Sequence, residues 1–205
     1  MNFNPSILAV SIALVSASAS ASSNQVIHLS GDHLNSIVIS NEMDVVVKCD
    51  AEQPRIEINA SDAVMPHMQT QVTQTAIDIV NHKDLNEGFF SFLKSSPEVT
   101  IYVRDHSVQH LDVQNGANLT ADHCVFNNTE QLSIAGENGA HLEVETNSPL
   151  VNLVLNSGGS AQICGETTIH GQLVSGSFLK TGEHVHISAV STFFGSSLGK
   201  TGDCS

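Results

Sequence analysis

Carboxylates are the side chains of this sequence whose type and spacing come nearest to acid–base chemistry. Glu143 and Glu145 stand two residues apart, so a strand would present both on one face. Enzymes that cleave polysaccharides work with such carboxylates together with a proton-transferring base. The chain has only 7 Lys and Arg residues, and no two carboxylates recur at matching positions of neighbouring repeats. No Gly-x-Ser-x-Gly motif or Cys/His dyad is legible. We therefore expect a protein that is not an enzyme, with a polysaccharide lyase or hydrolase as the alternative.

Histidines are numerous, with 11 in 205 residues, and three converging imidazoles would suit zinc or copper. His184 and His186 share one strand face, and His106, His110 and His123 are close in sequence. No further ligand has a diagnostic spacing, and the four cysteines form no Cys-x-x-Cys motif. We expect no metal site and no cofactor.

The elements that would position these residues are repeats between about 111 and 200. Alternating apolar pairs such as Leu111/Val113 precede a small polar corner with a glycine, and a second alternating strand follows. The corner glycines follow one another after 23, 19, 18 and 19 residues, at Gly116, Gly139, Gly158, Gly176 and Gly195. Glycine permits positive φ at such corners. One unit cannot bury its apolar face alone, so stacked copies predict a parallel β-helix or β-roll solenoid.

The segment that precedes the repeats predicts further strands within the same single domain. Short alternating runs occur at 26–29, 43–47, 55–58, 69–80 and 99–103, bounded by turn-forming residues. No window of this region has a helical i, i+3, i+4 stripe. We expect an all-β fold over 22–205, with irregular N-terminal strands and short caps.

Residues 1–21 indicate a secretory signal peptide. A nine-residue apolar run from Ile7 to Val15 is too short to span a bilayer, and the small residues 17–21 follow it. We expect cleavage after Ala19 or Ala21, no transmembrane segment in the mature chain, and a location in the periplasm or outside the cell.

Four cysteines in an exported chain favour disulfides, and three connectivities are open for Cys49, Cys124, Cys164 and Cys204. The last three are 40 residues apart, which is about two repeats, or about 9.6 Å along a regular stack. That separation is too large for a disulfide, so an irregular coil or a folded-back tail is needed. Cys204 is the best placed to fold back. We predict at least one disulfide.

Aromatic residues gather in one segment, where Phe89, Phe90 and Phe92 lie between polar turns. A partner-contact loop is one interpretation, and a flap that caps the solenoid core is the other. Phe193 and Phe194 are expected to help close the last coil.

The net charge of −14 disfavours nucleic acid and anionic membranes as partners, since both require basic residues.

The strand Asp44–Lys48, the strand Val99–Val103 and the tandem Leu-x-Val-x-x-Gly-small-x-Leu copies resemble the GIN head-domain family of autotransporter adhesins. The resemblance covers about 27–200 and implies a right-handed β-helix in an exported bacterial protein. It implies a binding or adhesion module of the envelope, with a glycan or cell-surface protein as partner. A structural envelope protein that forms homo-oligomers through its open coil ends is a further alternative.

Overall fold

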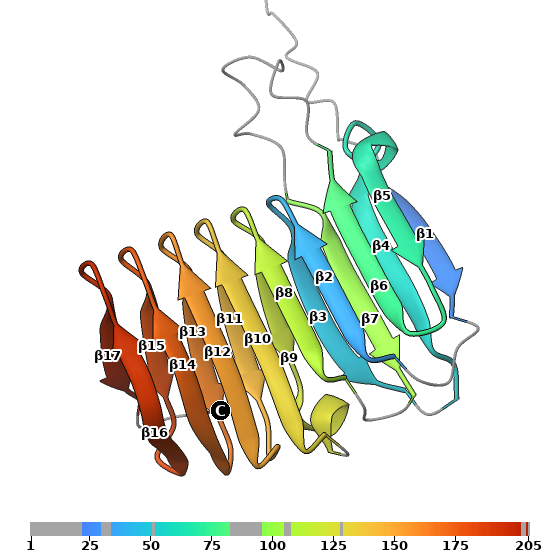
Figure 1. Cartoon of the computed structure of the whole chain (residues 1–205). Coiled ribbons are helices and arrows are strands. Elements are labelled where there is room, and N and C mark those ends of the chain that lie inside the picture. The colour runs from blue at the N-terminus through green and yellow to red at the C-terminus, as the bar shows by residue number, and fades with distance from the viewer. Residues whose placement is uncertain are drawn as a thin grey trace, which may run out of the picture.

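A computed structural model describes residues 22–29, 34–50, 52–82, 96–104, 108–127, 129–201 and 204. Two mixed β-sheets lie face to face, and two short 3-10 helices, η1 (Met65–His67) and η3 (His123–Phe126), complete the elements used below (Figure 1). The expected all-β fold class is confirmed. No helix in the described ranges has the length and apolar character needed to cross a membrane.

Among the described residues, sheet A has nine strands, which lie in the order β1 (Ser22–His28), β4 (Arg55–Ser61), β7 (Glu98–Val103), β3 (Asp44–Cys49), β9 (Asn118–Ala121), β11 (His141–Glu145), β13 (Ser160–Cys164), β15 (Phe178–Thr181) and β17 (Ser197–Lys200). The described part of sheet B has eight strands, in the order β16 (Val185–Thr192), β14 (Thr167–Leu173), β12 (Leu150–Asn156), β10 (Gln131–Glu137), β8 (His110–Gln114), β2 (Ser36–Ser40), β6 (Ala76–Asn81) and β5 (Met68–Val72).

From β8 onward the chain alternates between the two sheets, and we call one strand of sheet B with the following strand of sheet A a coil. Successive coils pair in parallel, as β10 does with both β8 and β12. The register is continuous except for one shift between β14 and β16. Inward positions such as Leu111 and Val113 are buried, and so are their register partners Ile134 and Gly136. The predicted apolar alternation thus forms a continuous core between the sheets.

The predicted corners lie between the two strands of each coil. Each has two consecutive residues with positive φ, which is the conformation of a type I′ turn, as at Asn138 (53°) and Gly139 (78°). All five marker glycines have positive φ. A corner of the same conformation that the repeats do not predict, Asn41–Glu42, joins β2 to β3.

The N-terminal strands differ from the expectation of an irregular region. β2–β3 and β6–β7 form two further coils, because β2 pairs in parallel with β6 and β8, and β3 with β7 and β9. The prediction of irregularity is wrong for these four strands. Their order in space, with β2–β3 between β6–β7 and β8–β9, departs from their order in the chain.

Antiparallel strands end the stack beyond β6–β7. β4 pairs antiparallel with β7, β1 antiparallel with β4, and β5 antiparallel with β6. The reversal of direction marks this end as a cap, as the sequence predicts in general terms.

The other end of the stack is the β16–β17 coil. Phe194 is 81% exposed and Phe193 is 48% exposed. The expectation that both residues close the last coil is therefore wrong. Phe194 occupies the corner itself, with a φ of 50°, so its side chain projects from the turn.

Candidate functional site

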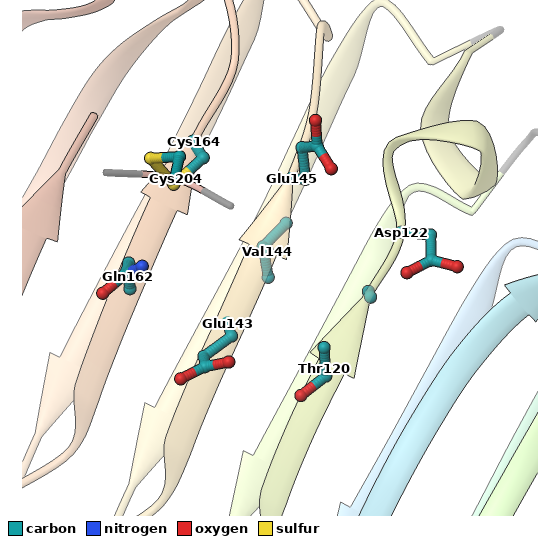
Figure 2. A pocket seen from close by; sticks show the side chains of 9 residues that line it. Thr120, Asp122, Glu143, Val144, Glu145, Gln162, Cys164 and Cys204 are labelled. Atoms are coloured by element: carbon teal, nitrogen blue, oxygen red, sulfur yellow. A yellow bond between two sulfur atoms is a disulfide. The ribbon is translucent and has the colours of Figure 1, made fainter. Parts of the chain in front are cut away.

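A groove of about 160 Å³ lies on the outer face of sheet A, across β9, β11 and β13 (Figure 2). Register places Glu143 of β11 beside Thr120 of β9 and Gln162 of β13. Asp122, which follows β9, and Glu145 add two more carboxylates. The lining of the groove thus has three acidic residues, and it has no Lys or Arg. The alternation of the strand sends these polar side chains outward while Val144 faces the core.

The Cys164–Cys204 disulfide forms one wall of this groove. Cys204 lies against Gly182, where a Cβ atom would stand 2.6 Å from the Cys204 sulfur. Cys204 therefore lies back against sheet A, as the sequence predicts for this residue. Gly182 has no Cβ atom and therefore leaves room for the Cys204 sulfur.

The second disulfide joins Cys49 at the end of β3 to Cys124 in η3. Both are partly buried against the core. The two cysteines belong to adjacent coils, because β3 pairs directly with β9. Repeat spacing alone does not reveal this pair, since it depends on the non-sequential position of β3. The prediction of at least one disulfide is confirmed.

A Ser–His–Glu arrangement borders the groove. His141 Nδ1 lies 2.8 Å from Ser160 Oγ, and His141 Nε2 lies 3.4 Å from Glu143 Oε1. Sequence reasoning missed it, since Ser160 is 19 residues from His141 and meets it only through the pairing of β11 with β13. The backbone N–H of Ser160 donates to the carbonyl of Ala140 and is not available to an oxyanion. The arrangement is a surface hydrogen-bond network without that element of nucleophilic catalysis.

The predicted histidine groups do not build a metal centre among the described residues, where no group of three or more His, Cys, Asp and Glu side chains could hold an ion. His123 Nδ1 lies 3.8 Å from Glu145 Oε2, beside the groove. His184 and His186 flank the start of β16, and both are exposed. His106 lies outside the described residues.

An arginine clamp fixes sheet A near its capped end. Arg55 on β4 donates hydrogen bonds of 2.7 Å to both Asp50 and Glu57, and its guanidinium carbon lies 3.8 Å from the centre of the Tyr102 ring. The hydrogen bond from Arg55 lowers the pKa of the Asp50 carboxyl below 3.8, and backbone N–H donors from Glu52 and Gln53 act in the same direction. The two carboxylates raise the pKa of Arg55 in turn. The charge of Arg55 is paired with these two carboxylates, so the clamp is a structural element.

Phe89, Phe90 and Phe92 lie outside the described residues, as does the predicted signal segment 1–21. The prediction that these three phenylalanines contact a partner therefore stays untested by the structure. The polar groove is the candidate site that the described part of the chain provides.

Together, the two-sheet stack, its regular corners and its two disulfides define a disulfide-bonded β-repeat protein with an open polar face. The family model for "Putative auto-transporter adhesin, head GIN domain" matches residues 33–178, and the chain belongs to that family. This confirms the resemblance inferred from the strand and corner motifs. No curated protein matches the chain.

Solved structures share the fold at low identity. A crystal structure of a putative adhesin from Bacteroides fragilis matches with a TM-score of 0.52 and 9% identity, over 89% of this chain and 98% of that one. A putative lipid binding protein from Parabacteroides distasonis matches with a TM-score of 0.50 and 9% identity, over 89% and 98%. At such identities the likeness concerns the fold alone.

Proposed function

We propose that this protein is an exported, non-catalytic binding module of the adhesion type, and that it holds its ligand on the outer face of sheet A. The observation that carries the proposal is the groove, where Thr120, Glu143 and Gln162 stand side by side on three parallel strands. Membership of the adhesin head-domain family supports the same function class.

The groove chemistry favours a ligand rich in hydroxyl groups. Carboxylates are hydrogen-bond acceptors, Gln162 both donates and accepts, and sugar hydroxyls complement both. A negatively charged ligand would meet three carboxylates in a chain of net charge −14. We therefore favour a neutral or cationic glycan, with a cell-surface protein of matching polarity as the alternative.

Phe89, Phe90 and Phe92 remain a proposed second contact. An aromatic loop would supply apolar area that the groove lacks. Export remains part of the proposal as well, with residues 1–21 as the cleaved signal and the periplasm or cell exterior as the destination. The two disulfides support an oxidising compartment.

We also propose that the coils form a right-handed β-helix, as the family resemblance implies. Regular parallel pairing within each sheet supports the solenoid description. An experimental structure of the protein would test the hand of the turn from β10 through β11 to β12.

The test is a glycan and surface-extract binding screen with the purified mature protein, run with calcium and with chelator, and with each mixture checked for new sugar ends. We expect binding without cleavage. The matched variants are Glu143→Ala/Glu145→Ala in the groove and Glu130→Ala/Glu137→Ala on the sheet B side. The groove variant should lose binding by about tenfold or more, whereas the control should not change it.

Release of new sugar ends would contradict the non-catalytic proposal and favour the polysaccharide-acting alternative. Equal binding by both variants would show that the binding site lies outside the groove. Phe89→Ser/Phe90→Ser/Phe92→Ser would then decide whether the aromatic loop is the contact, provided that the variant stays folded.

A further inference from the structure

The β16–β17 coil exposes apolar side chains at positions that the preceding coil, β14–β15, buries. Leu198 of β17 pairs in register with Leu179 of β15, which is 0% exposed, yet Leu198 is 44% exposed. Ile187 of β16 pairs with Ile169 of β14, which is 0% exposed, yet Ile187 is only half-buried. Within the described residues each of these strands has a sheet neighbour on one side only, so the end presents both apolar side chains and a strand edge.

The two described residues after β17, Thr201 and Cys204, are bonded to earlier coils. Thr201 donates its N–H to the carbonyl of Thr181, and Cys204 is bonded to Cys164 on β13, two coils back. The disulfide therefore holds the described tail off the open edge.

Charge makes this end suitable for a second copy of the chain. From Val185 to Lys200 there is no Asp or Glu, and Lys200 is the single Lys or Arg, although the whole chain has a net charge of −14. Two copies repel each other over most of their surfaces, but not here. Natural edge strands are usually protected by charged side chains that point along the open edge, and β16 has none.

The area is enough for a reversible dimer. Eight residues of β16 extend about 26 Å, and two sheets about 10 Å apart with their outer side chains give an end about 20 Å thick. The end therefore covers about 500 Å² on each copy, or about 1,000 Å² in total, which is near the lower limit for a specific interface.

We propose that the β16–β17 edge is a self-association surface, on which a second copy docks its own β16–β17 edge by antiparallel strand pairing about a two-fold axis. The stack then continues from one molecule into the other, and Leu198 becomes buried. Two-fold pairing closes the assembly, so the product is a dimer and not a filament.

Sedimentation equilibrium of the purified, disulfide-bonded protein over a wide concentration range tests this proposal. We expect a monomer–dimer equilibrium. Leu198→Lys should raise the dimer dissociation constant by about tenfold or more, because it places a charge in each half of the interface. Val72→Lys is the matched control, since Val72 is 38% exposed on β5 at the opposite end of the stack.

The Val72→Lys variant should dimerise like the wild type, and circular dichroism should show that both variants are folded. Should Leu198→Lys unfold the protein, Phe194→Asp replaces it, because that side chain is 81% exposed in its corner. A protein that is monomeric at every concentration would overturn the proposal and leave the edge for a strand of another protein. Loss of association in both variants would indicate head-to-tail packing and would overturn it as well.

Discussion

The side-chain amide of Asn138 donates a 3.0 Å hydrogen bond to Oδ1 of Asn115, one coil away in the stack. Asn115 makes the same 3.0 Å bond to Asn41 at the corner of the β2–β3 coil. Asn41 in turn donates to the backbone carbonyl of Asn81 at the end of β6. A ladder of asparagines thus joins three corners and ends on a fourth coil, so the corners contribute to the register of the stack as well as reversing the chain.

Asn138→Ala should lower the free energy of unfolding by about 1–3 kcal/mol. It removes the bond to Asn115 and places alanine at a φ of 53°, where a residue other than Gly, Asn or Asp is strained. Urea denaturation measures the change. Ser157→Asn at the next corner, with a φ of 50°, is the control and should maintain or raise stability by extending the ladder. Equal stabilities of the Ala variant and the wild type would show that the ladder contributes little.

Two buried threonines should respond in opposite ways to replacement by valine. Thr181 is 0% exposed and its hydroxyl has no hydrogen-bond partner among the described residues, so Thr181→Val should stabilise the protein by about 1 kcal/mol. Thr129 donates its hydroxyl to the carbonyl of Val108 at 2.9 Å, so Thr129→Val should destabilise it by about 1–2 kcal/mol. Thermal and urea unfolding of both variants tests the pair. A loss of stability in Thr181→Val would mean that its hydroxyl binds ordered water.

Loss of the Cys49–Cys124 disulfide should cost more stability than loss of Cys164–Cys204. The two bonds close segments of 75 and 40 residues, for which the chain-entropy estimates are about 4.5 and about 3.9 kcal/mol. The first bond also joins two adjacent coils at partly buried positions, whereas the second holds the tail. Thermal unfolding of the two double alanine variants compares them. A larger effect for the tail disulfide would contradict this ranking.

The clamp of Asp50 and Arg55 should make stability dependent on pH in the acid range. The pKa of Asp50 is lowered in the folded protein from 3.8, so its contribution is fully present well above pH 3.8. It is lost as the pH falls through the lower pKa of the folded state. Asp50→Asn should therefore be less stable than the wild type near neutral pH, and the difference should vanish in strong acid.

Urea unfolding of the wild type and Asp50→Asn at several pH values measures that difference. Arg55→Gln is the control, because without the guanidinium the Asp50→Asn substitution should have little further effect. A difference that stays constant from neutral pH to strong acid would assign the effect to the shape of the Asp50 turn and not to its charge.

Local sequence patterns predicted the repeat region because each coil there has its own apolar alternation and its own corner residues. Alternating pairs such as Leu111/Val113 specify an inward face, and a glycine after a small polar residue specifies a positive φ. The corner at Asn41–Glu42 escaped prediction because glutamate is not a turn-forming residue, although Glu42 has a φ of 26°. Its strand β2, Ser36–Ser40, was missed with it.

The long-range features of the site could not be predicted from the sequence. Glu143 meets Gln162 and Thr120, and His141 meets Ser160, through register between separate coils. Cys49 meets Cys124 because β3 takes a place in the stack that its position in the chain does not indicate. Residue types and spacing predicted most of the strands and the presence of disulfides, whereas the residues that pair across coils depend on which strand edges meet.

The position of β2–β3 has a consequence for how the molecule assembles. A chain synthesised from its N-terminus makes this coil first, yet both of its neighbours in space, β6–β7 and β8–β9, come later. β3 must therefore keep an unpaired edge until residue 121 has been made, because only then can β9 pair with it. Assembly of the capped half depends on contacts of long sequence separation, which are slow to form, whereas the later coils can add one after another to a finished template. The half made first is thus the half completed under the greater topological constraint.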